Sequence, residues 1–213
     1  MKLLFLCPRW GSESYSASEF ISRVQNAGYD GVEVGLSDGD AAADETAALA
    51  KETGLALVTQ HWMTTNRDID QHSELFEKRL LHAAGFQPLF INSHTGRDLF
   101  TLAENKQVFG VAERTAASTG IPIYHETHRG RCLHTPWRTA ELLRAMPSLR
   151  LVLDMSHWCN VCETLLQDQD DIIEPLLPGP QVSDPRAPEW DNALKAHLKW
   201  WDKNIAAHRR SST

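Results

Sequence analysis

The sequence has no long hydrophobic run and little that resembles a leader. No stretch approaches the roughly 18 consecutive apolar residues that a membrane-spanning helix needs. In the N-terminal stretch MKLLFLCPRWG, Lys2 is followed by only five apolar residues before Pro8, an apolar core too short for a signal peptide. We therefore expect neither a membrane span nor a secretory leader.

Cysteine and positive charge are also scarce. Four cysteines in 213 residues do not make a disulfide scaffold, so a reduced, cytoplasmic protein is expected. The net charge is −7 and the pI is about 5.8, which predicts no general attraction to nucleic acid. A small molecule is therefore the expected partner.

Two nucleotide-binding motifs are missing, because neither GxGxxG nor GxxxxGK[ST] follows any predicted strand. What the sequence does contain is an alternation of short apolar runs with longer amphipathic segments. The runs predict parallel strands covered on both faces. They are Leu3–Cys7, Gly31–Val34, Ala56–Gln60, Leu89–Asn92, Ile121–His125 and Arg150–Leu153.

The segments between these runs predict helices. Ser16 with Glu19 predicts the capped start of the first helix, and Pro136 lies near the first turn of the fifth. Further helices are predicted in residues 41–54, 72–85, 100–119, 161–177 and 190–208. In AGYDGVEV, ETGLALV and STGIPIY, Gly ends a helix shortly before a strand, a regularity that favours a (βα) barrel.

Histidines and carboxylates gather where the predicted strands end. Function in parallel α/β folds lies at these ends. The strand ends carry Glu33, the Gln60–Trp62 and Asn92–His94 stretches, His125-Glu126 with His128, and Asp154 with His157. Carboxylates with some imidazole suit Mg²⁺, Mn²⁺ or Co²⁺. Such an ion could bind two adjacent sugar oxygens and stabilise an enediolate while a carboxylate moves the proton.

The strand-end stretches GVEV, TQHW, NSHTG, YHETH and VLDMSHW resemble the xylose isomerase-like TIM-barrel family, the sugar phosphate isomerase/epimerase superfamily. The resemblance covers about the first 177 residues, and Asp154-x-x-His157 is its most specific element. It implies a divalent metal (Mn, Mg, Co or Zn) bound by Glu126 and Asp154. It also implies that His157 touches substrate or metal-bound oxygen, with His61 and His94 lining the pocket.

The sequence departs from this family after the sixth predicted helix. The family takes two further metal ligands, a His and a Glu, from strands 7 and 8. Residues 178–189 read instead as a Pro-rich loop and residues 190–208 as a terminal helix, all within one domain spanning 1–213. A barrel without these strands has unpaired edges, which favours self-association into a homo-oligomer.

Each candidate residue has a structural alternative. Glu126 and Asp154 would otherwise be helix caps or loop carboxylates, and Glu33, a catalytic candidate with Glu126 and His157, would otherwise be part of a buried ion pair. The predicted substrate-binding set has core packing or a solvated loop as its alternative. This set comprises His61, His94, His128, Arg129, Arg131, Trp62 and Trp158.

Three functions follow, in order of preference. The first is a metal-dependent sugar (phosphate) isomerase or epimerase that transfers a proton through a metal-stabilised enediolate. The second is a catalytically impaired, barrel-derived binding or assembly module, suggested by the two missing ligands. The third is an abasic-site endonuclease, a metal hydrolase that the negative net charge disfavours.

Overall fold

The computed structural model describes residues 4–166, 169–173 and 176. The chain divides into two compact units, Met1–Glu174 and Pro175–Thr213. The fold described below is that of the first unit. The predicted loop at 178–189 and the predicted helix at 190–208 lie outside the described residues.

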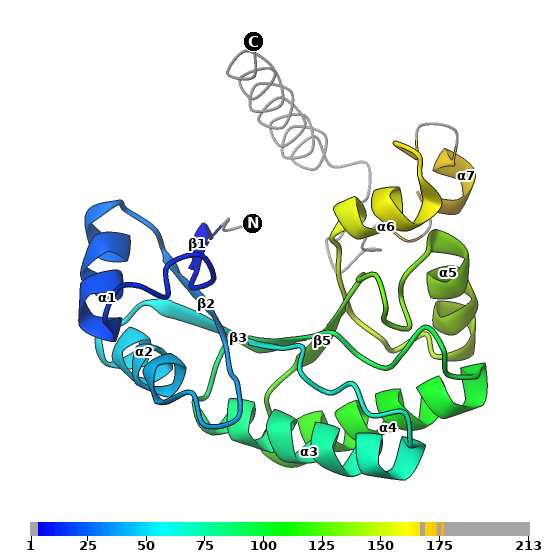
Figure 1. Cartoon of the computed structure of the whole chain (residues 1–213), viewed down its shortest axis with the longest axis horizontal. Helices are drawn as coiled ribbons and strands as arrows, with labels where there is room; N and C mark the ends of the chain where they lie inside the picture. The colour runs from blue at the N-terminus through cyan, green and yellow to red at the C-terminus, as the bar shows by residue number, and fades with distance from the viewer. Residues whose placement is uncertain (1–3, 167–168, 174–175, 177–213) are drawn as a thin grey trace. The chain divides into compact units, whose positions relative to one another are not determined.

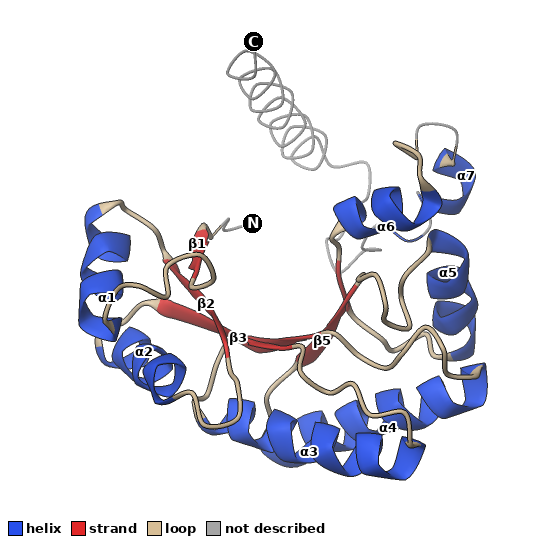
Figure 2. Ribbon diagram, viewed as in Figure 1, coloured by secondary structure: helices blue, strands red, loops and turns tan. Residues whose placement is uncertain are grey.

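Six parallel strands form a single sheet in the order in which they occur along the chain. They are β1 (Leu6–Pro8), β2 (Gly31–Gly35), β3 (Ala56–His61), β4 (Phe90–Ser93), β5 (Ile123–Glu126) and β6 (Leu151–Val152). The sheet curls into a half-barrel and helices cover its convex face, as Figures 1 and 2 show. This arrangement confirms the incomplete barrel predicted from the sequence.

The helices alternate with the strands. They are α1 (Ala17–Asn26), α2 (Ala41–Glu52), α3 (Ile69–Gly85), α4 (Leu102–Thr119), α5 (Pro136–Ala145), α6 (Met155–Cys162) and α7 (Asp170–Ile173). The Ser16 side chain accepts a hydrogen bond from the Glu19 amide, and Pro136 occupies the first turn of α5, as predicted. No helix of the described residues is long and apolar enough to cross a membrane.

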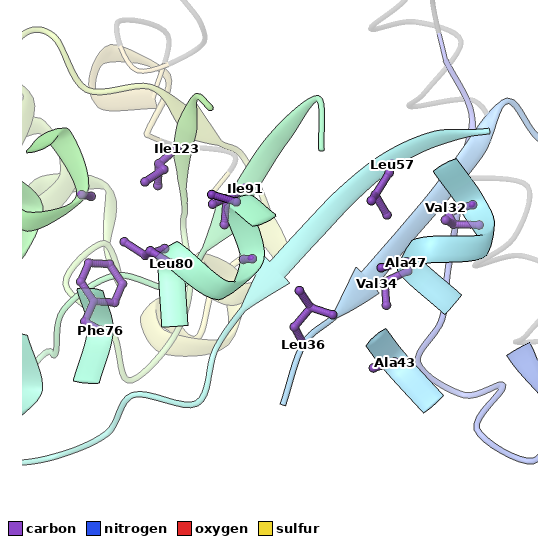
Figure 3. Close-up of a cluster of buried hydrophobic side chains, with 14 of the residues drawn as sticks. Val32, Val34, Leu36, Ala43, Ala47, Leu57, Phe76, Leu80, Ile91 and Ile123 are labelled. Carbon is purple, nitrogen blue, oxygen red and sulfur yellow. The ribbon is translucent and has the colours of Figure 1, made fainter. Parts of the chain in front are cut away.

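The hydrophobic core lies between the sheet and its helices. The β2 and β3 side of this core contains Val32, Val34 and Leu57, which lie near Ala47 of α2 (Figure 3). Further along the sheet, Ile91 of β4 lies beside Leu80 of α3 (Figure 3). Side chains along a strand alternate between the two faces of a sheet, so the intervening residues face the concave side. The helix side is therefore filled mainly with aliphatic side chains, and the concave side carries polar residues together with apolar ones such as Val58 and Phe90.

The sixth predicted helix is wrong in position. The sequence predicts a helix at 161–177, whereas α6 starts at Met155, directly after Asp154, and the chain turns out of it at Glu163, where φ is +52°. Asp154 causes the early start, because its Oδ1 accepts a hydrogen bond from the Ser156 amide, 2.9 Å away. The candidate metal ligand Asp154 is therefore also a helix cap.

Candidate active site

A cavity of about 980 Å³ lies on the concave face of the half-barrel. All six strands contribute to its wall. The apolar part of the lining includes Leu6, Val58, Phe90 and Val152. The polar part includes Glu33, Gln60, Asn92, His94, Glu126, His128, Asp154 and His157.

Glu126, at the end of β5, is the most highly connected carboxylate of the cavity. Its Oε2 accepts hydrogen bonds from Asn92 Nδ2 at 2.6 Å, His94 Nε2 at 3.0 Å and Gln60 Nε2 at 3.4 Å. Burial alone would raise the pKa of Glu126, but the hydrogen bonds from His94 and Asn92 outweigh burial and lower it. Glu126 is therefore an anion at neutral pH, although only 6% of it is exposed.

Glu33, at β2, is linked to Glu126 through Asn92. Asn92 Nδ2 lies 2.9 Å from Glu33 Oε1, so one amide group donates to both carboxylates. Burial raises the pKa of Glu33, and the negative charge of Glu126 raises it further, against the opposing hydrogen bond from Asn92. Two neighbouring carboxyl groups whose pKa values are displaced in opposite directions are the usual basis for separate acid and base roles.

Three imidazole rings lie in a row beside Glu126, with His94 and His128 stacked and His157 tilted against His128. The ring centroid of His128 lies 4.1 Å from that of His94 and 3.7 Å from that of His157. Burial and repulsion from His94 lower the pKa of His128 to about 4. Burial also lowers the pKa of His157, against the attraction of Asp154. His128 and His157 are therefore neutral at pH 7 and have ring nitrogens with free lone pairs.

Asp154 and His157 complete the cavity at the end of β6. Asp154 Oδ2 lies 3.8 Å from His157 Nε2. The backbone of Asp154 is fixed to β5, because its N–H donates to Thr127 Oγ1 at 2.8 Å and its carbonyl accepts from that hydroxyl at 2.9 Å. Thr127 thus holds Asp154 close to Glu126, which lies on the preceding strand.

The donor atoms of the cavity fit a divalent cation. Glu126, Asp154 and His157 each offer one ligand atom, and these three atoms lie within 4.8 Å of one another; the same holds for His94, Glu126 and His128. His157 Nδ1 is buried without a hydrogen-bond partner. Carboxylate oxygens with neutral imidazole nitrogens are ligands for first-row divalent metals.

Four predicted substrate-binding residues do not line the cavity. His61 lies in the core, with Nε2 2.8 Å from Thr64 Oγ1 and its ring edge against Phe76. Trp158 is fully buried and donates from Nε1 to the carbonyl of Leu133. Arg131 is buried and donates to the carbonyls of Trp62 and Thr64, whereas Arg129 is exposed. For His61 the physical reason is strand alternation, because it follows the cavity-facing Gln60 and so points to the helices.

The other predicted residues do line the cavity. They are Glu33, Trp62, His94, Glu126, His128, Asp154 and His157. Gln60 and Asn92, for which the sequence predicts no role, both line the cavity and both contact Glu126. The sequence contains a signal that could have found them, because each lies one residue before a side chain that faces the helices. Gln60 precedes His61 on β3, and Asn92 precedes Ser93 on β4, with the two amides paired in register. Strict two-residue alternation would have placed both amides on the carboxylate side.

Comparison with solved structures supports the fold. The probable 3-DHS dehydratase AsbF from Bacillus anthracis matches with a TM-score of 0.57 at 16% identity, over 81% of this chain and 70% of that one. The 3-keto-D-glucoside 4-epimerase YcjR from E. coli matches with a TM-score of 0.59 at 18% identity, over 80% of this chain and 76% of that one.

A third similar structure is a xylose isomerase-like TIM barrel protein from Mycobacterium smegmatis in complex with magnesium. It matches with a TM-score of 0.51 at 13% identity, over 72% of this chain and 65% of that one. No curated protein sequence matches the chain. The family model for the xylose isomerase-like TIM barrel matches residues 21–202, most of the sequence. With this match and the six-stranded half-barrel, the chain belongs to the xylose isomerase-like TIM barrel family.

Proposed function

We propose that this protein is a divalent-metal-dependent isomerase or epimerase that acts on a sugar or a related hydroxy-carbonyl compound by proton transfer. The observation that carries the proposal is the position of Glu126, Asp154 and His157, whose ligand atoms lie within 4.8 Å of one another at the open cavity. A third carboxyl group, that of Glu33, is linked to Glu126 through the side-chain amide of Asn92.

Glu126 and Asp154 would hold the cation, as Glu126 is an anion and Asp154 is fixed by Thr127. A divalent cation supplies positive charge that stabilises the negative charge developing on substrate oxygens. Glu33 is assigned the proton transfer at a substrate carbon, because its raised pKa brings it nearer to neutral pH than an ordinary carboxyl. His157 is placed to donate to or accept from a substrate hydroxyl.

The cavity wall suits a neutral sugar. The Trp62 indole packs directly on Gly35 and presents an apolar face to the cavity. Of the two arginines predicted to recognise a phosphate, Arg131 is engaged by backbone carbonyls and Arg129 lies on the surface. We therefore propose an unphosphorylated substrate.

The names of two similar structures agree with this chemistry. One is a 3-keto-D-glucoside 4-epimerase, in which the inverted carbon adjoins the keto carbon. The other is a probable dehydratase. A proton on the carbon next to a carbonyl is acidic enough for a carboxylate to remove it. In this chain the Glu33 carboxylate would remove that proton, and the cation at Glu126 and Asp154 would stabilise the negative charge on the carbonyl oxygen.

Solvent exchange provides the test. The metal-loaded protein is incubated in D₂O with a panel of ketohexoses and 3-keto-D-glucosides, and deuterium at the carbons beside the carbonyl is followed by NMR. We expect the wild-type protein to exchange deuterium into a substrate. Glu126→Ala and Asp154→Ala should lose both this exchange and the binding of Mn²⁺ or Co²⁺. In Glu33→Gln we expect exchange to fall by at least about 100-fold while metal binding remains. His82→Ala, at an exposed histidine, is the matched control. Metal binding that persists unchanged in both Glu126→Ala and Asp154→Ala would show the assignment of the site to be wrong.

A further inference from the structure

We propose that, given the metal centre of the proposed function, His94 and His128 each contribute a ring nitrogen to the cation that Glu126 binds. The cation would then have imidazole ligands from β4 and β5 in addition to the carboxylates. Neither histidine was predicted as a metal ligand from the sequence.

The position of His94 carries the first part of this proposal. Its Nε2 lies 3.0 Å from Glu126 Oε2, and both side chains are more than 90% buried. Two ligand atoms bound to one ion by bonds of about 2.1 Å lie at most about 4.2 Å apart. His94 Nε2 and Glu126 Oε2 therefore already meet the distance that one shared cation requires. The cation would take the place of the proton that His94 Nε2 donates to Glu126, and the neutral ring would then carry its proton on Nδ1.

The tautomer of His128 carries the second part. His128 Nδ1 lies 2.6 Å from the carbonyl oxygen of Arg129, so Nδ1 carries the proton and donates it. Nε2 is then the nitrogen with a free lone pair in the neutral ring. Metal-binding histidines commonly donate their other N–H to a backbone carbonyl, which fixes the ring and its tautomer. His128 is thus oriented as a nitrogen ligand before any metal arrives.

The three donor atoms form one group. The ligand atoms of His94, Glu126 and His128 lie within 4.8 Å of one another, so small side-chain movements would bring them around one ion. Stacking of the His94 and His128 rings, with centroids 4.1 Å apart, keeps both rings beside the carboxylate. Gln60 Nε2, 3.4 Å from both His94 Nε2 and Glu126 Oε2, is close enough to hold the carboxylate in place.

The nitrogen ligands determine which cation the site prefers. Mg²⁺ prefers oxygen ligands and keeps its waters, whereas Zn²⁺ and Co²⁺ bind imidazole readily. A centre with His94 and His128 among its ligands should therefore select Zn²⁺ or Co²⁺ over Mg²⁺. With carboxylates alone, this preference would be much weaker.

The test counts imidazole ligands directly. The full chain is stripped of metal and loaded with one equivalent of Zn²⁺, and X-ray absorption measures the number of imidazoles on the zinc. We expect the count to fall by one in His94→Ala and by one in His128→Ala, and to remain unchanged in His82→Ala. Competition titrations should show Co²⁺ affinity at least about 10-fold weaker in both cavity variants. Circular dichroism confirms that each variant is folded.

The possible results separate this proposal from the proposed function. An unchanged imidazole count in His94→Ala and His128→Ala would overturn the ligand assignment, even if Co²⁺ affinity fell through movement of Glu126. Loss of the cation in Glu126→Ala and Asp154→Ala would then leave the proposed function intact. Conversely, a reduced count in both histidine variants, with no deuterium exchange in any sugar, would support the ligand assignment and contradict the isomerase. If the wild-type chain bound Mn²⁺ but neither Zn²⁺ nor Co²⁺, the ligand assignment would fail and the proposed function would stand. If it bound no divalent cation, both proposals would fail.

Discussion

The side-chain amide of Asn92 lies 2.6 Å from the carboxylate of Glu126, and the same nitrogen is 2.9 Å from Glu33. Because carboxylate oxygens only accept, the NH₂ group must face both acids, and Asn92 Oδ1 points away, buried and without a partner. One amide thus holds together two acids that would otherwise repel each other. Glu33 lies on β2, Asn92 on β4 and Glu126 on β5, so their spacing depends on the register of the sheet from β2 to β5.

Replacing Asn92 tests this bridge. In Asn92→Leu both acids lose a donor, so we expect the pKa of Glu126 to rise and the free energy of unfolding at pH 7 to fall by about 1–3 kcal/mol. NMR titration of the carboxyl carbons in metal-free protein and urea unfolding measure the two effects. Asn26→Leu, on the exposed surface of α1, is the matched control and should change neither. An unchanged pKa of Glu126 would contradict the role of the bridge.

The buried histidine of β5 should make stability depend on pH. His125 is 2% exposed, its Nδ1 contacts Thr95 Oγ1 at 2.7 Å, and burial lowers its pKa to about 3. Between about pH 6.5 and 3 the unfolded chain binds more protons at this residue than the folded chain does. The stabilisation is therefore complete above pH 6.5 and is lost as the pH falls, by up to about 1.4 kcal/mol per pH unit.

Urea unfolding at pH 7.5, 6.0 and 5.0 measures this dependence. In His125→Gln the slope of the unfolding free energy against pH should be shallower than in the wild type. Asn26→Gln, a replacement of one uncharged side chain by another on the exposed surface of α1, should retain the wild-type slope. Equal slopes in all three proteins would mean that His125 is not held neutral by burial.

Gly35 makes room for the indole of Trp62. A Cβ atom at Gly35 would lie 2.2 Å from Trp62 Cζ3, so Gly35→Ala must displace the ring. Because a side-chain ring can move, we expect a loss of stability of about 1 kcal/mol, at the lower end of the usual cost of overpacking. The indole N–H signal of Trp62, identified by its absence in Trp62→Phe, should shift. Gly85→Ala has open space around the new methyl group and should leave that signal in place.

The start of α4 carries a capping box. Thr101 Oγ1 accepts from the Glu104 amide, and the Glu104 carboxylate accepts from the Thr101 amide at 2.7 Å. Thr101→Ala should lower the free energy of unfolding by about 1 kcal/mol, because one amide of the first turn loses its acceptor. Thr101→Ser keeps the hydroxyl and should recover most of the loss in the same urea experiment. A serine variant as unstable as the alanine variant would point to packing of the threonine methyl group instead.

Much of the fold can be predicted from the sequence because its signals are local. Ser16 and Pro136 mark helix starts through hydrogen bonds and backbone angles that involve only neighbouring residues. Gly28, Gly54 and Gly120 follow helices with φ near +75°, a conformation that glycine adopts without strain. The sequence predicts the helix after β6 too late in the chain, because it presents Asp154 either as a helix cap or as a metal ligand. In the structure the Asp154 carboxylate caps α6 and also faces His157.

The sequence by itself determined the alternation of strands and helices and the presence of carboxylates at the ends of the second, fifth and sixth strands. Only the tertiary structure decided which strand-end side chains share the cavity. The physical reason is that side chains alternate along a strand, so an error of one residue reverses the face. Gln60 and His61 are adjacent in the sequence, yet Gln60 contacts Glu126 and His61 packs on Phe76 among the helices.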